Sequence, residues 1–182
     1  GHRVHATDNE NETRHDFALL FGLSLSDFVA SRSGKWGGQI EHLNHDLAGA
    51  EGWADLKQFF SILNETVRYL VLRKAELLLG PTAMKDCGDI DVLTDNLPEM
   101  LFVANGKPIS NLHHTVHIGG QGLLFEFQCI GDGNFDPKWQ ESMLARRELL
   151  QDGVYAPSTE DYFYSLLPSH PIYCYVRKIY CC

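Results

Sequence analysis

The sequence predicts an α+β domain in which a mixed β-sheet of about four strands is flanked by helices. Segments with apolar residues at helical spacing predict helices, and short β-rich runs predict strands. Along the chain they give the order helix, strand, strand, helix, strand, strand, helix, helix. Hydrophobic residues make up 44% and charged residues 21% of the 182 residues, which is ordinary for a folded chain. That length suits one domain with a small appendage.

A helix followed by a strand opens the predicted domain. Residues 53–65 (WADLKQFFSILNE) carry apolar side chains at helical spacing, so one face of this helix should be buried. Residues 68–73 (RYLVLR) form a short β-rich apolar run that is typical of a strand. A helix-like run begins at Lys74 and breaks at Gly80 and Pro81.

The middle of the chain predicts three strands and one helix. Residues 89–93 (DIDVL) indicate a strand, and residues 97–105 (LPEMLFVAN) indicate a short helix after a turn. A hairpin follows, in which residues 115–118 pair with residues 123–130 (LLFEFQCI). Residues 119–122 (GGQG) turn the chain, because glycine adopts positive φ readily.

Two amphipathic helices end the predicted domain. Residues 138–150 (KWQESMLARRELL) have helical spacing, and residues 158–167 (STEDYFYSLL) begin with a Ser/Thr cap and an acidic first turn. The chain therefore divides into three expected parts. The first part is a polar arm and irregular connector over residues 1–50, of which residues 1–16 are expected to be mobile. The folded domain over residues 51–167 and a C-terminal tail over residues 168–182 follow.

The composition excludes several classes of protein. Asp and Glu number 24 against 15 Lys and Arg, a formal net charge of −9, so a basic surface that grips nucleic acid is not expected. No apolar run approaches the roughly 20 residues of a membrane-spanning helix. Residues 1–13 lack the apolar core of a secretory signal peptide. The five cysteines contain no CxxC pair, and reduced thiols are the expected state. A cytoplasmic protein is expected, and the connector-like start indicates a piece of a longer polypeptide.

Two carboxylates are the most informative feature of the sequence. Asp89 and Asp91 should point to one face of their strand, while Ile90 and Val92 point to the other. Carboxylates this close repel each other unless a cation or a proton lies between them. Magnesium prefers such hard oxygen ligands, usually one or two carboxylates together with substrate phosphates. A solvated, polar strand edge is the alternative interpretation.

A third acid lies on a later predicted strand. Glu126 sits between two phenylalanines, so it should occupy the polar face of that strand. If this strand lies beside the strand of Asp89, Glu126 completes a three-carboxylate cluster that could hold two metal ions. His113 and His117 would also share a strand face, and both a metal-binding pair and an exposed polar face remain open for them.

Four segments together resemble a known superfamily. They are RYLVLRKAELL (68–78), GDIDVLTDNLP (88–98), VHIGGQGLLFEFQCIGDGNFDPKWQ (116–140) and TEDYFYSLL (159–167). Over residues 53–167 the chain resembles the nucleotidyltransferase superfamily with a polymerase-β-like core. More narrowly, it resembles nucleotidyltransferase-like domains that often lie beside polysaccharide-biosynthesis enzymes.

The resemblance implies a nucleotidyltransferase-like fold and a metal-dependent transferase activity. A nucleoside monophosphate would move from an NTP to a small acceptor such as a sugar or sugar phosphate. Asp89, Asp91 and Glu126 would be the catalytic, metal-binding residues, with Mg²⁺ as the cofactor and Mn²⁺ as an alternative.

The nucleotide phosphates need contacts of their own. Many members of the superfamily place Gly-Ser or Gly-Gly at a helix start ahead of the two aspartates, whereas this chain has Gly80 and Pro81 there, and proline offers no amide hydrogen. Arg73, Lys74 and Gly88 are therefore the candidate nucleotide-binding residues.

Two other functions stay open. A glycosyltransferase could hold a nucleotide sugar with the same Asp-x-Asp pair, although the 88 residues before Asp89 show no alternating strand–helix pattern. A catalytically degenerate domain could serve as an interaction module within a polysaccharide-assembly protein, and the proline at position 81 favours that view. Asp132, Asp136 and Arg146 are weaker candidates, because turn and helix-surface compositions account for them.

Overall fold

The core of the protein is a mixed five-stranded sheet. The computed structural model describes residues 7–31, 37–38, 42, 44, 46–79 and 88–166. The strand order is β1-β2-β5-β4-β3, in which β2 and β5 run parallel and the other neighbours run antiparallel. The strands are β1 (Tyr69–Val71), β2 (Ile90–Thr94), β3 (Lys107–Pro108), β4 (His113–Ile118) and β5 (Gln121–Cys129). The expected α+β class with a mixed sheet is confirmed.

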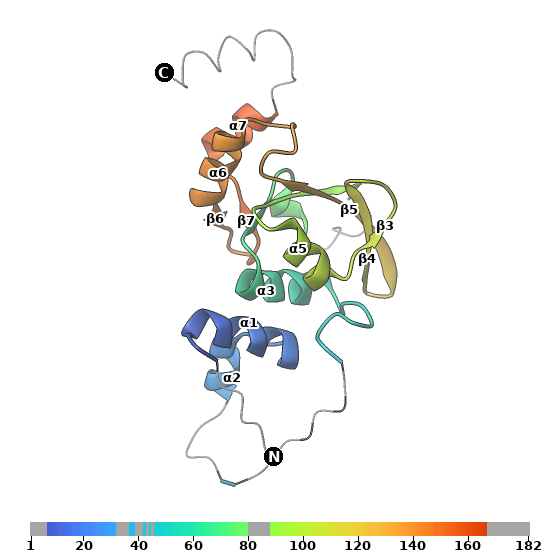
Figure 1. The fold of residues 1–182 in the computed structure, drawn as a ribbon, viewed down its shortest axis with the longest axis vertical. Helices are drawn as coiled ribbons and strands as arrows, with labels where there is room; N and C mark the ends of the chain where they lie inside the picture. The colour runs from blue at the N-terminus through green and yellow to red at the C-terminus, as the bar shows by residue number, and fades with distance from the viewer. Residues whose placement is uncertain are drawn as a thin grey trace.

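Helices cover both faces of this sheet. The helices in the body of the protein are α3 (Leu56–Thr66), α5 (Leu97–Ala104), α6 (Pro137–Ala145) and α7 (Thr159–Ser165). Phenylalanines of α3 and β5 meet in the larger core, with the rings of Phe59 and Phe125 5.3 Å apart. On the other face, Met143 and Leu144 of α6 pack with Leu93 of β2 in a smaller core. The layers can be followed in Figure 1.

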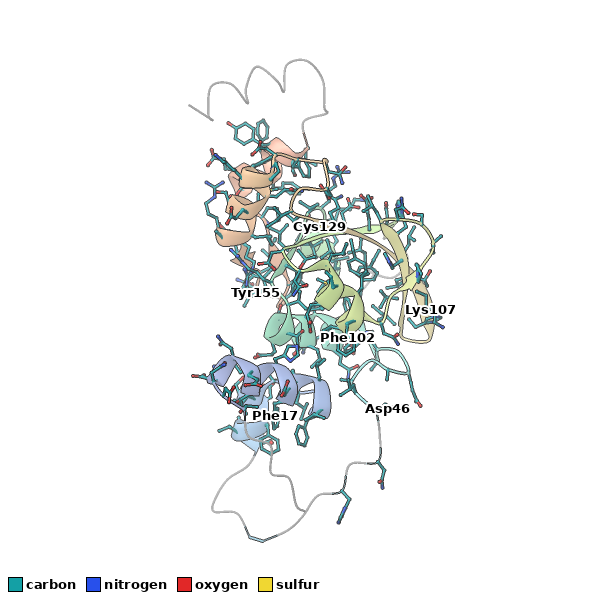
Figure 2. All side chains as sticks on the ribbon, viewed as in Figure 1. Phe17, Asp46, Phe102, Lys107, Cys129 and Tyr155 are labelled. Atoms are coloured by element: carbon teal, nitrogen blue, oxygen red, sulfur yellow. The ribbon has the colours of Figure 1, made fainter. Side chains whose placement is uncertain are left out.

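The main sheet has five described strands rather than about four, because β3 joins its edge. The sequence indicated a chain break at residues 105–108, but Lys107 and Pro108 pair with Thr115 and His114. Proline is tolerated here, since an edge strand does not need every backbone donor. In Figure 2, Lys107 marks this edge of the sheet at the right of the view, and Tyr155, whose ring contacts Tyr69 of β1 at the other edge, lies at the left.

Helix α3 begins later than the apolar spacing suggested. Asp55 accepts a hydrogen bond from the backbone N–H of Gln58 and caps the helix, which leaves Trp53 outside it. Trp53 instead exchanges backbone hydrogen bonds with His117 and Gly119 near the end of β4. Its buried ring then fills the space beside Gly49.

The described part of the N-terminal region contains two helices where the sequence indicated a polar arm and an irregular connector, and residues 1–6, 32–36, 39–41, 43 and 45 lie outside the described residues. Residues 10–21 form helix α1 (Glu10–Phe21) and residues 25–31 form α2 (Leu25–Ser31). Asn9 caps α1 at its start, and Gly22 ends it in the left-handed conformation with φ 65°. Ala18 and Leu19 are buried, and α1 lies beside α3 at the opposite end of the molecule from α7 (Figure 1).

The C-terminal part also differs from the sequence pattern. Helix α6 ends at Ala145, five residues before the expected end, and a two-stranded sheet of β6 (Glu148–Leu149) and β7 (Tyr155–Ala156) follows. The guanidinium of Arg147 lies 4.4 Å from the centre of the Tyr155 ring, a contact that a helical continuation would not provide. The expected tail over residues 168–182 lies outside the described residues.

Candidate metal-binding site

The acids identified in the sequence meet across two neighbouring parallel strands. Asp91 of β2 lies opposite Glu126 of β5 in the sheet register. Ile90 and Val92 are buried in the larger core, so Asp91 points to the other face, as does Glu126 between two buried phenylalanines. Asp89 directly precedes β2 and is exposed. The structure thus brings together the three carboxylates that the sequence placed on one polar face.

Helix α6 packs on the same sheet face as the carboxylates, and the carboxylates lie at the end of that face which α6 leaves uncovered. Leu93, two residues after Asp91 on the same face, packs against Met143 and Leu144 of α6. The side chains of Asp91 and Glu126 retain 13% and 19% of their exposure. This half-buried position strengthens electrostatic interactions while leaving access to solutes.

His113 belongs to the same site, from the next strand of the sheet. It lies opposite Glu126 on β4, and its Nε2 is 3.7 Å from Glu126 Oε2. One possible ligand atom from each of Asp89, His113 and Glu126 lies within 4.8 Å of the others. His117 shares the less buried face of β4 with His113, as expected, but it lies opposite Gly122 near the turn and is exposed.

The sequence missed the pairing of His113 with Glu126, although the hairpin contains the necessary signal. The turn consists of Gly119 and Gly120, both at positive φ (59° and 76°), and it pairs Ile118 with Gln121. Counting back from a two-residue turn places His113 opposite Glu126. A four-residue turn over residues 119–122 would instead place His113 opposite Gln128.

Arg73 follows β1, the neighbour of β2 on the side away from β5, and approaches the site from there. Its Nε lies 3.7 Å from Asp91 Oδ2, although 54% of the Arg73 side chain is exposed. Lys74 begins a short 3₁₀ helix, η1 (Ala75–Leu77), with a left-handed backbone at φ 55°, and its side chain is exposed. A Cβ atom on Gly88 would meet no atom of the described residues within 4 Å, so none of these neighbours requires glycine beside Asp89. Gly80 and Pro81 lie outside the described residues.

The electrostatics of the site are those of crowded negative charge. Burial raises the pKa of Asp91 above its usual value, and the charges of Glu126 and Asp89 raise it further. The charges of Arg73 and His113 act in the opposite direction without overcoming this effect. A divalent cation would supply the missing positive charge, which is the situation that the carboxylate pattern predicted.

Gln128 is a further member of the site that the sequence did not single out for a role. It lies two residues after Glu126 on the same face of β5 and is only 7% exposed. Its Nε2 donates a hydrogen bond of 2.8 Å to Glu126 Oε1. Its own Oε1 has no hydrogen-bond partner among the residues that the structure describes.

The weaker sequence candidates have structural roles. Asp136 caps α6 by accepting hydrogen bonds from two backbone N–H groups, and Asp132 accepts one from the Gln140 side chain. Arg146 pairs with the buried carboxylate of Asp161 at 2.7 Å. None of these contacts involves the carboxylate site on β2 and β5.

Comparison with known proteins adds no further assignment. No family model, curated protein or solved structure matches the chain. Within the described ranges, no helix has the length and apolar character that crossing a membrane requires. The functional argument therefore rests on the geometry of the site.

Proposed function

We propose that this protein is a metal-dependent nucleotidyltransferase that transfers a nucleoside monophosphate from an NTP to a small acceptor such as a sugar or sugar phosphate. The observation that carries the proposal is the register of β2 and β5, in which Asp91 faces Glu126 on one sheet face and Asp89 precedes β2. The sequence resemblance to nucleotidyltransferases supports the same conclusion. In the proposal, the fold is nucleotidyltransferase-like and the protein is cytoplasmic.

The donor set fits a divalent cation. Asp89, Asp91 and Glu126 offer hard carboxylate oxygens, and burial together with the negative charges of Glu126 and Asp89 raises the pKa of Asp91. Mg²⁺, or Mn²⁺ in its place, would be held by these three residues and would offset the charge of the polyphosphate.

The reaction itself is a displacement at the α-phosphorus of the NTP. An acceptor hydroxyl oxygen forms the new bond to phosphorus, the bond to the bridging oxygen breaks, and pyrophosphate leaves. The hydroxyl proton passes to solvent water, because Asp89, Asp91 and Glu126 serve as cation ligands in the proposal. Arg73, half exposed beside Asp91, is placed to bind a phosphate oxygen, and Lys74 and Gly88 lie next to these residues in the chain.

A second function is favoured by a specific observation. Each of the two half-buried carboxylates already has a partner, Asp91 with Arg73 and Glu126 with His113 and Gln128. A catalytically degenerate interaction module would keep such pairs without binding a nucleotide. In that case the guanidinium of Arg73 would occupy the position that an enzyme needs for its divalent cation.

Titration of the full chain with Mg²⁺ and each of the four NTPs tests the proposal. Calorimetry should show binding of at least one Mg-NTP, and ³¹P NMR should show pyrophosphate released when sugar phosphates are added. Asp91→Asn should reduce release by at least about 10- to 100-fold. Asp152→Asn, which removes one exposed charge in the turn before β7, is the matched control and should match the wild type.

Three outcomes would contradict the proposal. Absence of binding with every NTP would favour the interaction module, as would binding that is unchanged in Asp91→Asn. Binding of a UDP- or GDP-sugar with Mn²⁺ and no pyrophosphate release from NTPs would instead indicate a glycosyltransferase.

A further inference from the structure

The site contains an imidazole where a magnesium site normally has oxygen ligands only. His113 comes from β4, Glu126 from β5 and Asp89 from the residue that precedes β2. A ligand atom from each lies within 4.8 Å of the others, close enough for one ion to contact all three. Three separate segments of the fold therefore converge on a single point.

The ring of His113 is held in an orientation suited to metal binding. Its Nδ1 lies 3.0 Å from Ser110 Oγ, and its Nε2 lies on the side of Glu126. Ser110 is itself fixed, because its backbone N–H donates a 3.2 Å hydrogen bond to the carbonyl of His113. With Nδ1–H donating to Ser110 Oγ, Nε2 keeps its lone pair and is available as a ligand.

Gln128 provides a second, independent observation. It is more than nine-tenths buried, its Nε2 holds one oxygen of Glu126 at 2.8 Å, and its Oε1 is unpartnered within the described part of the chain. Glu126 therefore has one oxygen fixed by Gln128 and the other facing His113. A buried amide that orients a carboxylate is the outer-shell arrangement typical of metal ligands.

We propose that Asp89, His113 and Glu126 bind one transition-metal ion, and that His113 makes the protein prefer Mn²⁺ over Mg²⁺. Imidazole nitrogen is a poor ligand for Mg²⁺ and a good one for the divalent transition metals, whose affinities for nitrogen donors are higher. Mn²⁺ also accepts carboxylate and phosphate oxygens, so it suits the rest of the site. This inference rests on the proposed function in that it names the ion of the same site, but binding of the ion needs no nucleotide.

Metal titration of the full chain without nucleotide tests the inference. Mn²⁺ binding is followed by the loss of the free-ion EPR signal, and Mg²⁺ binding by competition with Mn²⁺. His113→Ala should weaken Mn²⁺ binding by about 10-fold or more while changing Mg²⁺ binding by less than about 3-fold. His117→Ala is the matched control, because it removes an exposed imidazole from the same strand, four positions away from His113.

A measurement on the wild-type chain removes any dependence on how the variants fold. Pulsed EPR of bound Mn²⁺ should show modulation from an imidazole nitrogen, which should vanish in His113→Gln. Mn²⁺ bound without that nitrogen signal would overturn the inference, as would equal Mn²⁺ affinities in His113→Ala and the wild type. Mn²⁺ bound through the nitrogen in a protein that binds no NTP supports this inference and contradicts only the proposed function.

Discussion

Replacement of Gln128 by leucine should separate the stability of the fold from the chemistry of the site. Gln128 is 7% exposed and donates one hydrogen bond to Glu126, while its Oε1 has no partner among the described residues. Leucine has a similar volume and carries no polar atom. Gln128→Leu therefore removes one favourable and one unfavourable feature of the native state.

The magnitudes of the two effects are similar and their signs are opposite. Loss of a hydrogen bond to the charged Glu126 should cost about 1.5–3 kcal/mol, and removal of the unsatisfied buried Oε1 of Gln128 should recover about 1–3 kcal/mol. With both effects in the middle of their ranges, the free energy of unfolding should change by no more than about 1 kcal/mol, or about 2–4 °C in Tm. Glu126 loses the group that orients it, so Mn²⁺ affinity should fall about 10- to 100-fold.

Gln140→Leu is the matched control, because Gln140 is a fully buried glutamine away from the site. Its Oε1 accepts a hydrogen bond from the Gly131 N–H, and its Nε2 donates to Asp132 and to the Cys129 carbonyl. All its polar atoms are satisfied, so leucine should destabilise the protein by about 2–4 kcal/mol. Mn²⁺ affinity should remain that of the wild type.

Differential scanning calorimetry and Mn²⁺ titration by EPR, applied to both variants, give the comparison. The expected pattern is a near-native Tm with weak Mn²⁺ binding for Gln128→Leu, and the reverse for Gln140→Leu. A Gln128→Leu protein that melts as early as Gln140→Leu would refute the energetic reasoning. One that binds Mn²⁺ as tightly as the wild type would refute the role of Gln128 in orienting Glu126.

Two further predictions concern contacts that hold the helices. Asp161→Ala removes a buried carboxylate that bonds Arg146 at 2.7 Å, and should cost about 3 kcal/mol, or about 6–12 °C in Tm by calorimetry. Burial acts to lower the pKa of His15, but hydrogen bonds to Glu99 and Asp16 outweigh it and raise that pKa above its usual value. His15 should therefore stabilise the protein by about 0.2–1 kcal/mol at pH values below its unfolded pKa of about 6.5. This contribution should disappear as the pH rises through the folded pKa. Urea unfolding of the wild type and of His15→Ala at pH 5.5 and 8 measures the difference.

Each of these predictions has a clear contrary result. Arg146→Ala should cost less than Asp161→Ala, because Arg146 is half exposed, and equal losses would mean that the buried carboxylate is not the critical partner. For His15, a stability difference that grows between pH 5.5 and 8 would show that the contacts with Glu99 and Asp16 do not favour the protonated ring.

The strands that carry the acids were predictable because their patterns are local. At the start of β2, Ile90 and Val92 alternate with Asp91 and with Asp89, which precedes the strand, and a half-buried strand requires that alternation. Glu126 between two phenylalanines follows the same rule. The neighbourhood of β2 and β5 was not predictable, because it depends on how segments distant in sequence pack together.

Other elements escaped prediction for physical reasons that differ from one to the next. Helix α1 is mostly polar and buries little beyond Ala18 and Leu19, so apolar spacing gave no signal, although its capping residues Asn9 and Gly22 are conventional. β3 is two residues long and contains Pro108, and a run this short has no periodicity to detect. Packing against the rest of the protein, rather than local preference, stabilises both elements.

The arrangement of the proposed ligands has a consequence for how the protein refolds. His113 and Glu126 belong to one hairpin closed by a two-residue turn, and such hairpins form in about 1–10 μs. Asp89 arrives only when β2 inserts between β1 and β5, which is a slower, non-local step. A partly folded chain would thus hold two of the three proposed ligands, and capture of Mn²⁺ during refolding would mark the moment at which the central strand takes its place.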